Sequence, residues 1–235
     1  MTEIVLILGG TREAAELAAE LAAAHPDWRI ITSLAGRTKE PAPVAGETRI
    51  GGFGGAEGLA AYIRTEGVTR LIDATHPFAT QISANARAAA DMTGVPLEVR
   101  TREPWQRQPG DLWTEVSSLE QACDAVPAGA RVLLALGSQH IALFAARADV
   151  HFLVRMVDKP ETPLPLPDHT LRIGKPGNTA AEETELLKTH AITHIVCRNS
   201  GGDGAYAKIE AARQLQLPVI VVQPAGTAAS GERKP

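Results

Sequence analysis

The sequence is poor in the features that mark disulfide-linked, membrane-spanning and metal-binding proteins. Its 235 residues include two cysteines, Cys123 and Cys197, which lie far apart and lack the spacing of a metal motif. They are expected to be buried thiols in a reducing compartment. No apolar run reaches the roughly 18 residues of a membrane-spanning helix. The seven histidines are scattered along the chain, and no metal site is predicted.

An excess of positive charge is also missing. Lysine and arginine number 23 against 27 aspartate and glutamate residues, which gives a formal net charge of −4. This balance argues against a nucleic-acid partner. The segment Met1–Leu8 runs directly into a strand-like stretch and lacks the basic, apolar, small-residue order of a signal peptide. A cytoplasmic protein without a membrane partner is therefore expected.

Short β-branched apolar runs alternate with alanine-rich helical segments along the chain. Continuous apolar strands between helices predict a parallel sheet covered on both faces, and right-handed crossovers make such a sheet doubly wound. In the first half, strands are expected at Glu3–Leu8, Arg29–Leu34, Thr48–Ile50, Arg70–Asp73 and Leu97–Arg100, and helices at Arg12–Ala24, Glu57–Thr65 and Phe78–Met92.

A polar stretch at 101–110, with Pro104 and Pro109, marks a boundary. The fold class predicted is α/β, with lobes at 1–102 and 103–235, mostly parallel sheets and a cleft between the lobes. Thr179 and Glu182 form a capping box that starts a helix. Strands of the second lobe are expected at Leu112–Val116, Arg131–Leu136, His151–Met156, Ile192–Arg198 and Pro218–Val222, and Lys159–Pro167 is expected to be a loop.

The turn Gly9–Gly10–Thr11 lies between the first strand and the first helix. At this position of a doubly wound sheet, a phosphate can meet the amides of a helix N-terminus. Glycine lets the backbone approach a pyrophosphate, and the Thr11 hydroxyl offers a further donor. The full G-x-G-x-x-G pattern is absent, so a tight turn of an ordinary α/β protein remains the alternative.

The end of the second strand carries residues suited to a phosphate. Sites selective for NAD usually place an acid here, whereas NADP sites often place an arginine nearby. Arg37 is available, and Ser33 and Thr38 can donate further hydrogen bonds. This pattern favours NADPH over NADH, although Glu40 is close and a solvated Arg37 is the alternative interpretation.

Two more turns follow strands of the first lobe. Four glycines in Gly51–Gly55 suit a backbone that passes close to a ligand or a helix, or a flexible loop. The segment after the fourth strand brings Asp73, Thr75 and His76 to the carboxyl edge of the sheet, where ligands bind in such folds. Thr75 is expected to cap the next helix, with Pro77 in its first turn. A purely structural cap with a satisfied histidine is the alternative.

A second glycine-rich turn follows the strand that ends at Arg198. The chain reads Asn199-Ser200-Gly201-Gly202 and then enters a helix that carries Lys208. The amides of this turn, together with Arg198 and Lys208, suit substrate carboxylates or a cofactor phosphate. The alternative interpretation of this segment is an ordinary turn beside surface cations.

Several segments together resemble the precorrin-6A reductase family of cobalamin biosynthesis, in the same order and over nearly the whole chain. The most specific are Asp-Ala-Thr-His-Pro-Phe-Ala at 73–79 and Asn-Ser-Gly-Gly at 199–202; the others are Ile-Leu-Gly-Gly-Thr-x-Glu-Ala at 7–14, Ser-Leu-Ala-Gly-Arg-Thr at 33–38, Gly-Gly-Phe-Gly at 51–54 and Lys-Ile-Glu-Ala-Ala at 208–212. Where the family has lysine before Asn-Ser-Gly-Gly, this chain has Arg198.

The resemblance implies two Rossmann-like lobes with NADPH between them and reduction of one macrocycle double bond, from precorrin-6A to precorrin-6B. The small-molecule partner is then a tetrapyrrole, and neighbouring pathway enzymes are candidate partners. Cofactor-binding residues are expected at Gly9, Gly10, Thr11, Ser33, Gly36, Arg37, Thr38, Gly52 and Asp73. Substrate-binding residues are expected at Thr75, His76, Arg198, Asn199, Ser200, Gly201 and Lys208.

No protein acid is assigned, because the basic nitrogens of a conjugated macrocycle can take up a proton and so activate the acceptor carbon. Thr75, His76 and Lys208 are positioning candidates. Two other functions stay open: a non-catalytic NADPH-sensing protein, and a nucleotide-sugar-modifying enzyme of the same fold. The second lacks support from a Tyr-x-x-x-Lys pair, since Tyr206 and Lys208 are two residues apart.

Overall fold

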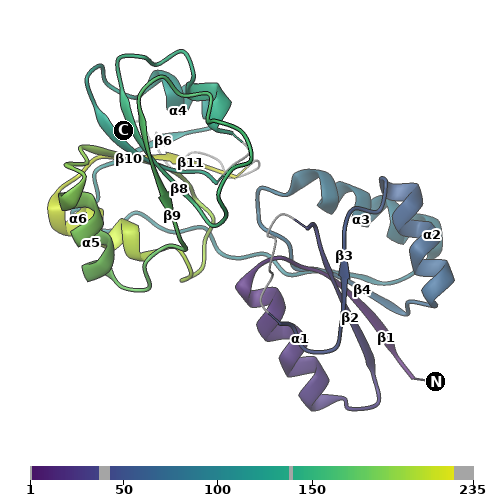
Figure 1. The fold of residues 1–235 in the computed structure, drawn as a ribbon. Helices are drawn as coiled ribbons and strands as arrows, with labels where there is room; N and C mark the ends of the chain where they lie inside the picture. Colours follow the sequence, from purple (N-terminus) through teal and green to yellow (C-terminus); the bar gives the residue numbers. More distant parts are fainter. Residues whose placement is uncertain (1, 37–42, 138–139, 225–235) are drawn as a thin grey trace, which may run out of the picture. The chain divides into compact units, whose positions relative to one another are not determined.

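The computed structural model describes residues 2–36, 43–137 and 140–224. The chain divides into two compact units, Met1–Arg102 and Glu103–Pro235. Each unit contains one sheet in which every paired strand is parallel, with helices packed against it (Figure 1). The predicted α/β class with parallel sheets is confirmed.

The first unit is a doubly wound sheet with the strand order β3-β2-β1-β4-β5. The chain runs outward from β1 to β3 and then crosses to β4 on the other side of β1, so its direction of progress reverses between β1 and β4. Ligands of such sheets bind beyond the carboxyl ends of the strands at this reversal. The elements are β1 Ile4–Leu8, α1 Arg12–Ala24, β2 Arg29–Leu34, β3 Glu47–Ile50, α2 Ala56–Glu66, β4 Arg70–Asp73, α3 Thr80–Thr93 and β5 Leu97–Val99.

The two faces of this sheet are covered by different helices. Val5 and Ile7 of β1 pack with Ala14 and Leu17 of α1, whereas alternate residues of the same strand, such as Leu6, pack with α2 and α3. Because both faces are buried, β1 is a continuous apolar run, as parallel strands usually are. This burial fixes the register that places the ends of β1 and β4 side by side.

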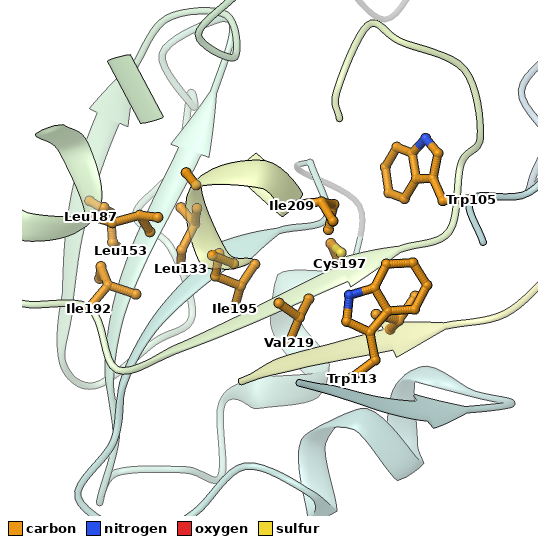
Figure 2. Packing of buried hydrophobic residues seen from close by; sticks show 13 residues of the cluster. Trp105, Trp113, Leu133, Leu153, Leu187, Ile192, Ile195, Cys197, Ile209 and Val219 are labelled. Carbon is orange, nitrogen blue, oxygen red and sulfur yellow. The ribbon is translucent and has the colours of Figure 1, made fainter. Parts of the chain in front are cut away.

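The second unit has a six-stranded sheet in its described part, with the order β6-β11-β10-β7-β8-β9. A second reversal lies between β7 and β10. Figure 2 shows Leu133 of β7 and Ile195 of β10 in the core beneath α5 and α6, with Leu187 and Ile209. The elements are β6 Trp113–Val116, α4 Leu119–Asp124, β7 Arg131–Ala135, η1 Ile141–Phe144, β8 His151–Met156, β9 His169–Ile173, α5 Ala180–Thr189, β10 His194–Arg198, α6 Ala207–Leu215 and β11 Val219–Val222.

Two caps test the local sequence patterns. The Thr179 hydroxyl accepts a hydrogen bond from the Glu182 amide at 3.3 Å, so the predicted start of α5 is confirmed. The predicted cap at Thr75 is wrong, because α3 begins at Thr80 with Ala79 as its N-cap. The Thr75 hydroxyl instead donates to the carboxylate of Asp73, a competing acceptor two residues away.

Candidate functional site

The loops after β1 and β4 meet at the reversal of the first sheet. The Ala74 amide donates to Leu8 O at 3.0 Å, and the Thr11 hydroxyl donates to Ala74 O at 3.1 Å. The same hydroxyl oxygen accepts from the Ala14 amide, so Thr11 is the N-cap of α1. The hydroxyl proton, which was expected to be available to a phosphate, is thus directed to Ala74 O in this structure. Thr11 instead fixes the start of α1 against the β4 loop.

Gly9 and Gly10 have different structural reasons to be glycine. A Cβ atom at Gly9 would lie 3.0 Å from Thr32 Cγ2, so this glycine permits close packing against β2. Gly10 has φ +104°, in the region that favours glycine, and no atom lies within 4 Å of where its Cβ would be. The backbone at Gly10 is thus open on the side that leads into α1. The pyrophosphate of a dinucleotide fits such an open turn at a helix N-terminus.

The end of β2 is joined to β3 by an arginine that the sequence reasoning missed. Ser33 is buried, and its Oγ lies 3.4 Å from Nη1 of Arg49. The Arg49 guanidinium also donates to the carbonyl oxygens of Gly51 and Gly52. Gly36 lies near Ile50 at the same sheet edge. Arg37 and Thr38, the other residues expected to hold a phosphate, lie outside the described residues.

The segment after β4 presents three polar side chains at the same edge. Asp73 is buried, and its Oδ1 accepts from both the amide and the hydroxyl of Thr75, at 3.1 and 2.6 Å. Nδ1 of His76 accepts from the Phe78 amide at 3.2 Å. A neutral His76 ring therefore carries its proton on Nε2. Asp73 pairs in register with Leu8, so this segment lies beside the Gly9–Thr11 turn.

Asn199, which was expected to bind substrate, joins two segments of the second unit by hydrogen bonds. It is 1% exposed. Its side-chain oxygen accepts from the Trp105 amide at 2.7 Å, and its nitrogen donates to Trp105 O and to Gln223 Oε1. Asn199 thus holds the segment before β6 against the end of β10, and its hydrogen-bonding groups are used within the unit.

The turn that follows Asn199 depends on two glycines. Gly201 and Gly202 have φ values of 63° and 65°, which ordinary side chains rarely adopt. The Gly202 carbonyl accepts from Nε1 of Trp105 at 2.7 Å. Ser200 is buried, and its amide donates to Arg198 O. The turn therefore has a defined backbone conformation. It lies at the carboxyl end of β10, next to β7, where the strand order of the second sheet reverses.

Lys208 is not the surface cation that its sequence position allowed. It is 4% exposed. Its ammonium group donates to Ala205 O at 2.6 Å and lies 4.7 Å from the centre of the Trp105 ring. Burial lowers the pKa of Lys208 below its ordinary value. A buried lysine beside a tryptophan ring can hold neighbouring groups in position, and a lowered pKa makes it easier for the lysine to lose its proton.

The described ranges contain no helix both long and apolar enough to cross a membrane. Within the same ranges, no group of three or more histidine, cysteine, aspartate or glutamate side chains is arranged to hold a metal ion.

The fold and the site define a two-unit, doubly wound α/β protein with an open glycine turn beside α1. Against known families, residues 4–233 match the precorrin-6x reductase CbiJ/CobK family. The chain belongs to this family of oxidoreductases.

Individual relatives agree with this membership. The precorrin-6A reductase of Rhodobacter capsulatus is 51% identical over 93% of this chain and 86% of its own length. That of Mycobacterium tuberculosis strain H37Rv is 42% identical over 96% of this chain and 92% of its own. A solved structure of CobK precorrin-6A reductase is 50% identical, covers 97% of this chain and 90% of its own, and superposes with a TM-score of 0.90.

Proposed function

We propose that the protein is an NADPH-dependent precorrin-6A reductase that reduces one double bond of the macrocycle to give precorrin-6B. The observation that carries this proposal is the 51% identity to a precorrin-6A reductase along nearly the whole of both chains. The proposal also includes a cytoplasmic setting and neighbouring pathway enzymes as partners, as expected from the sequence.

The first unit offers residues suited to NADPH. The open backbone at Gly10 and the start of α1 suit the pyrophosphate, and Ser33 with Arg49 provides hydroxyl and guanidinium donors at the end of β2. When bound, NADPH supplies the hydride, from the nicotinamide C4 to an electrophilic carbon of the macrocycle. The protein must then hold the two carbon atoms about 3–3.5 Å apart and exclude water.

His76 and Thr75 are the polar side chains suited to the substrate side in this unit. Asp73 fixes the orientation of Thr75 by accepting both of its donors, at 3.1 and 2.6 Å. The bond from the Phe78 amide fixes the tautomer of His76 and keeps a proton on Nε2. Both residues are therefore expected to act by positioning the substrate.

The names of the relatives favour a metal-free macrocycle as substrate. Relatives named precorrin-6A reductase are 42–51% identical to this chain. Those named cobalt-precorrin-6A reductase are 26–29% identical. Since the chain is closer in sequence to the first group, we infer that precorrin-6A without cobalt is the preferred substrate.

The test is anaerobic incubation of the full chain with precorrin-6A, following the absorbance of NADPH. Oxidation of NADPH in step with substrate loss is expected, with much slower oxidation of NADH. Cobalt-precorrin-6A serves as the comparison substrate and is expected to react more slowly. An NADPH-sensing protein would bind NADPH without oxidising it, and a nucleotide-sugar-modifying enzyme would bind a nucleotide sugar in place of the tetrapyrrole. Either result would overturn the proposal.

A further inference from the structure

Arg49 lies where a doubly wound sheet meets the ribose of a dinucleotide. Ser33 of β2 and Arg49 of β3 are register partners in the parallel pair, so their side chains share one face of the sheet. Nη1 of Arg49 approaches Ser33 Oγ to 3.4 Å. The carboxyl end of β2 is the part of such a sheet at which the adenosine ribose is recognised.

The guanidinium group of Arg49 is held in place by uncharged partners. Nη1 donates to Gly51 O, and Nη2 donates to Gly52 O at 2.8 Å. The Cζ atom lies 3.8 Å from the centre of the Phe53 ring and 5.2 Å from that of Tyr62. None of these partners among the described residues is a carboxylate, so the positive charge of Arg49 is not neutralised by them.

The held guanidinium keeps donors for a ligand. Arginine has five N–H donors, and the carbonyl and hydroxyl oxygens named above engage three of them. Within the described ranges, two donors of this guanidinium remain without a hydrogen-bond partner. A fixed guanidinium with two donors matches two oxygens of a phosphate monoester. Because the Arg49 side chain is already ordered in the fold, binding a ligand costs little further side-chain entropy.

We propose that Arg49 recognises the 2′-phosphate of NADPH, with the Ser33 hydroxyl beside it, and so sets the preference for NADPH over NADH. This inference rests on the proposed function. The residue proposed to recognise the phosphate therefore belongs to β3, and its guanidinium is held by the loop 51–53. The sequence had indicated only residues at the end of β2 and just after it.

The loop 51–53, which holds the Arg49 guanidinium, depends in turn on its packing against α2. Phe53 lies over the start of that helix, and a Cβ atom at Gly58 would lie 1.8 Å from Phe53 O. Glycine at position 58 therefore lets the loop 51–53 lie close enough to α2 to hold the guanidinium. The position of Arg49 is thus supported by packing of this loop on α2.

The test compares binding of NADPH and NADH to the full chain and to R49M, by titration of nicotinamide fluorescence. R49M is expected to weaken NADPH binding by about 10- to 100-fold, the usual range for charged hydrogen bonds, and to change NADH binding by less than about twofold. R70M is the matched control. The Arg70 guanidinium also lies over an aromatic ring, 5.3 Å from the centre of the Trp28 ring. However, Arg70 is the first residue of β4 and so lies at the amino ends of the strands, away from the proposed site. Both affinities of R70M should equal those of the wild type.

Each other outcome overturns a defined part of the argument. Equal weakening of both dinucleotides, or no weakening, removes Arg49 from the 2′-phosphate while leaving the reductase proposal intact. Failure of the wild-type chain to bind either dinucleotide overturns the reductase proposal and this inference together. If R49M does not fold, R49K takes its place. It retains the charge without the planar fork, so a smaller loss confined to NADPH is expected, and equal losses would overturn the inference.

Discussion

Asn199 illustrates how a single buried amide can join segments far apart in the chain. Its side chain satisfies both the amide and the carbonyl of Trp105, 94 residues earlier. Truncating it would leave those two backbone groups buried without partners, and each such group costs about 1–3 kcal/mol.

N199A is therefore expected to lower the free energy of unfolding by about 2–4 kcal/mol and to leave NADPH affinity of the folded protein unchanged. Urea unfolding and dinucleotide titration measure the two effects. N85A is the control, because Asn85 is only partly buried on α3 and bonds only to Gln81 among the contacts described. A loss of NADPH affinity with unchanged stability would instead assign Asn199 to a binding site.

Lys208 makes stability depend on pH in a defined direction. Burial lowers the pKa of Lys208 in the folded chain, whereas the unfolded chain has the ordinary lysine value of about 10.4. Between these two values the unfolded chain binds more protons, so stability rises with pH there. At pH values below the pKa of Lys208 in the folded chain, the buried ammonium is charged, and its burial lowers the free energy of unfolding by the full amount.

K208M is thus expected to be more stable than the wild type at pH 7, by on the order of 1 kcal/mol, with an advantage that shrinks as pH approaches 10. Urea unfolding of both proteins at pH 7 and pH 9.5 measures this difference. K188M, which replaces an exposed lysine in the last turn of α5, should show no such trend. An advantage for K208M that stays constant with pH would contradict the assignment.

At the scale of elements, α1 is positioned by one hydroxyl. Thr11 caps the helix and also donates to Ala74 O in the β4 loop. T11V removes both bonds with little change in shape. We expect a loss of about 1–2 kcal/mol in stability, as for other N-caps, and weaker binding of NADPH and NADH alike. T11S should recover most of both losses. Thermal unfolding and titration provide the readouts, and weaker binding of NADPH alone would be inconsistent with this role.

The order of strands, turns and helices could be predicted because buried parallel strands are continuous apolar runs. The edge strand β9 was missed because its five residues are half-buried or exposed and lack such a run. Helix α4, with six residues, is too short to show a periodic pattern.

The meeting of the motifs at the sheet edge could be predicted from the sequence, whereas the hydrogen-bond partners of individual side chains could not. Leu8 and Asp73 are register partners, so the two motifs after β1 and β4 meet, as expected. The partner of Asn199 is distant in sequence and carries no motif, so its burial could not be foreseen. Arg49 was not predicted for the same reason, since the role proposed for it depends on the register of β3 against β2.

At the scale of the whole molecule, the two units have separate cores. The clusters around Leu133, Leu6 and Val5 each draw their residues from one unit. A domain with its own core can fold alone.

The fragment 1–102 is accordingly expected to unfold cooperatively and to bind 2′,5′-ADP, the adenosine part of NADPH, within about threefold of the full chain, since the residues proposed to hold this part of the cofactor all lie in the first unit. Circular dichroism during urea unfolding and calorimetry measure the two properties. The fragment 103–235 is the control and should not bind 2′,5′-ADP. A fragment 1–102 without a cooperative transition would show that its core needs the other unit.

Gly58 limits how this enzyme can be made more thermostable. Replacing a glycine inside a helix with alanine is a common stabilising change, worth about 1 kcal/mol. Here the added methyl group would meet the carbonyl of Phe53 at 1.8 Å and push the loop outward. A redesign that scores only helix propensity would therefore choose this position, and if Arg49 acts as proposed it would weaken selectivity between the two nicotinamide dinucleotides.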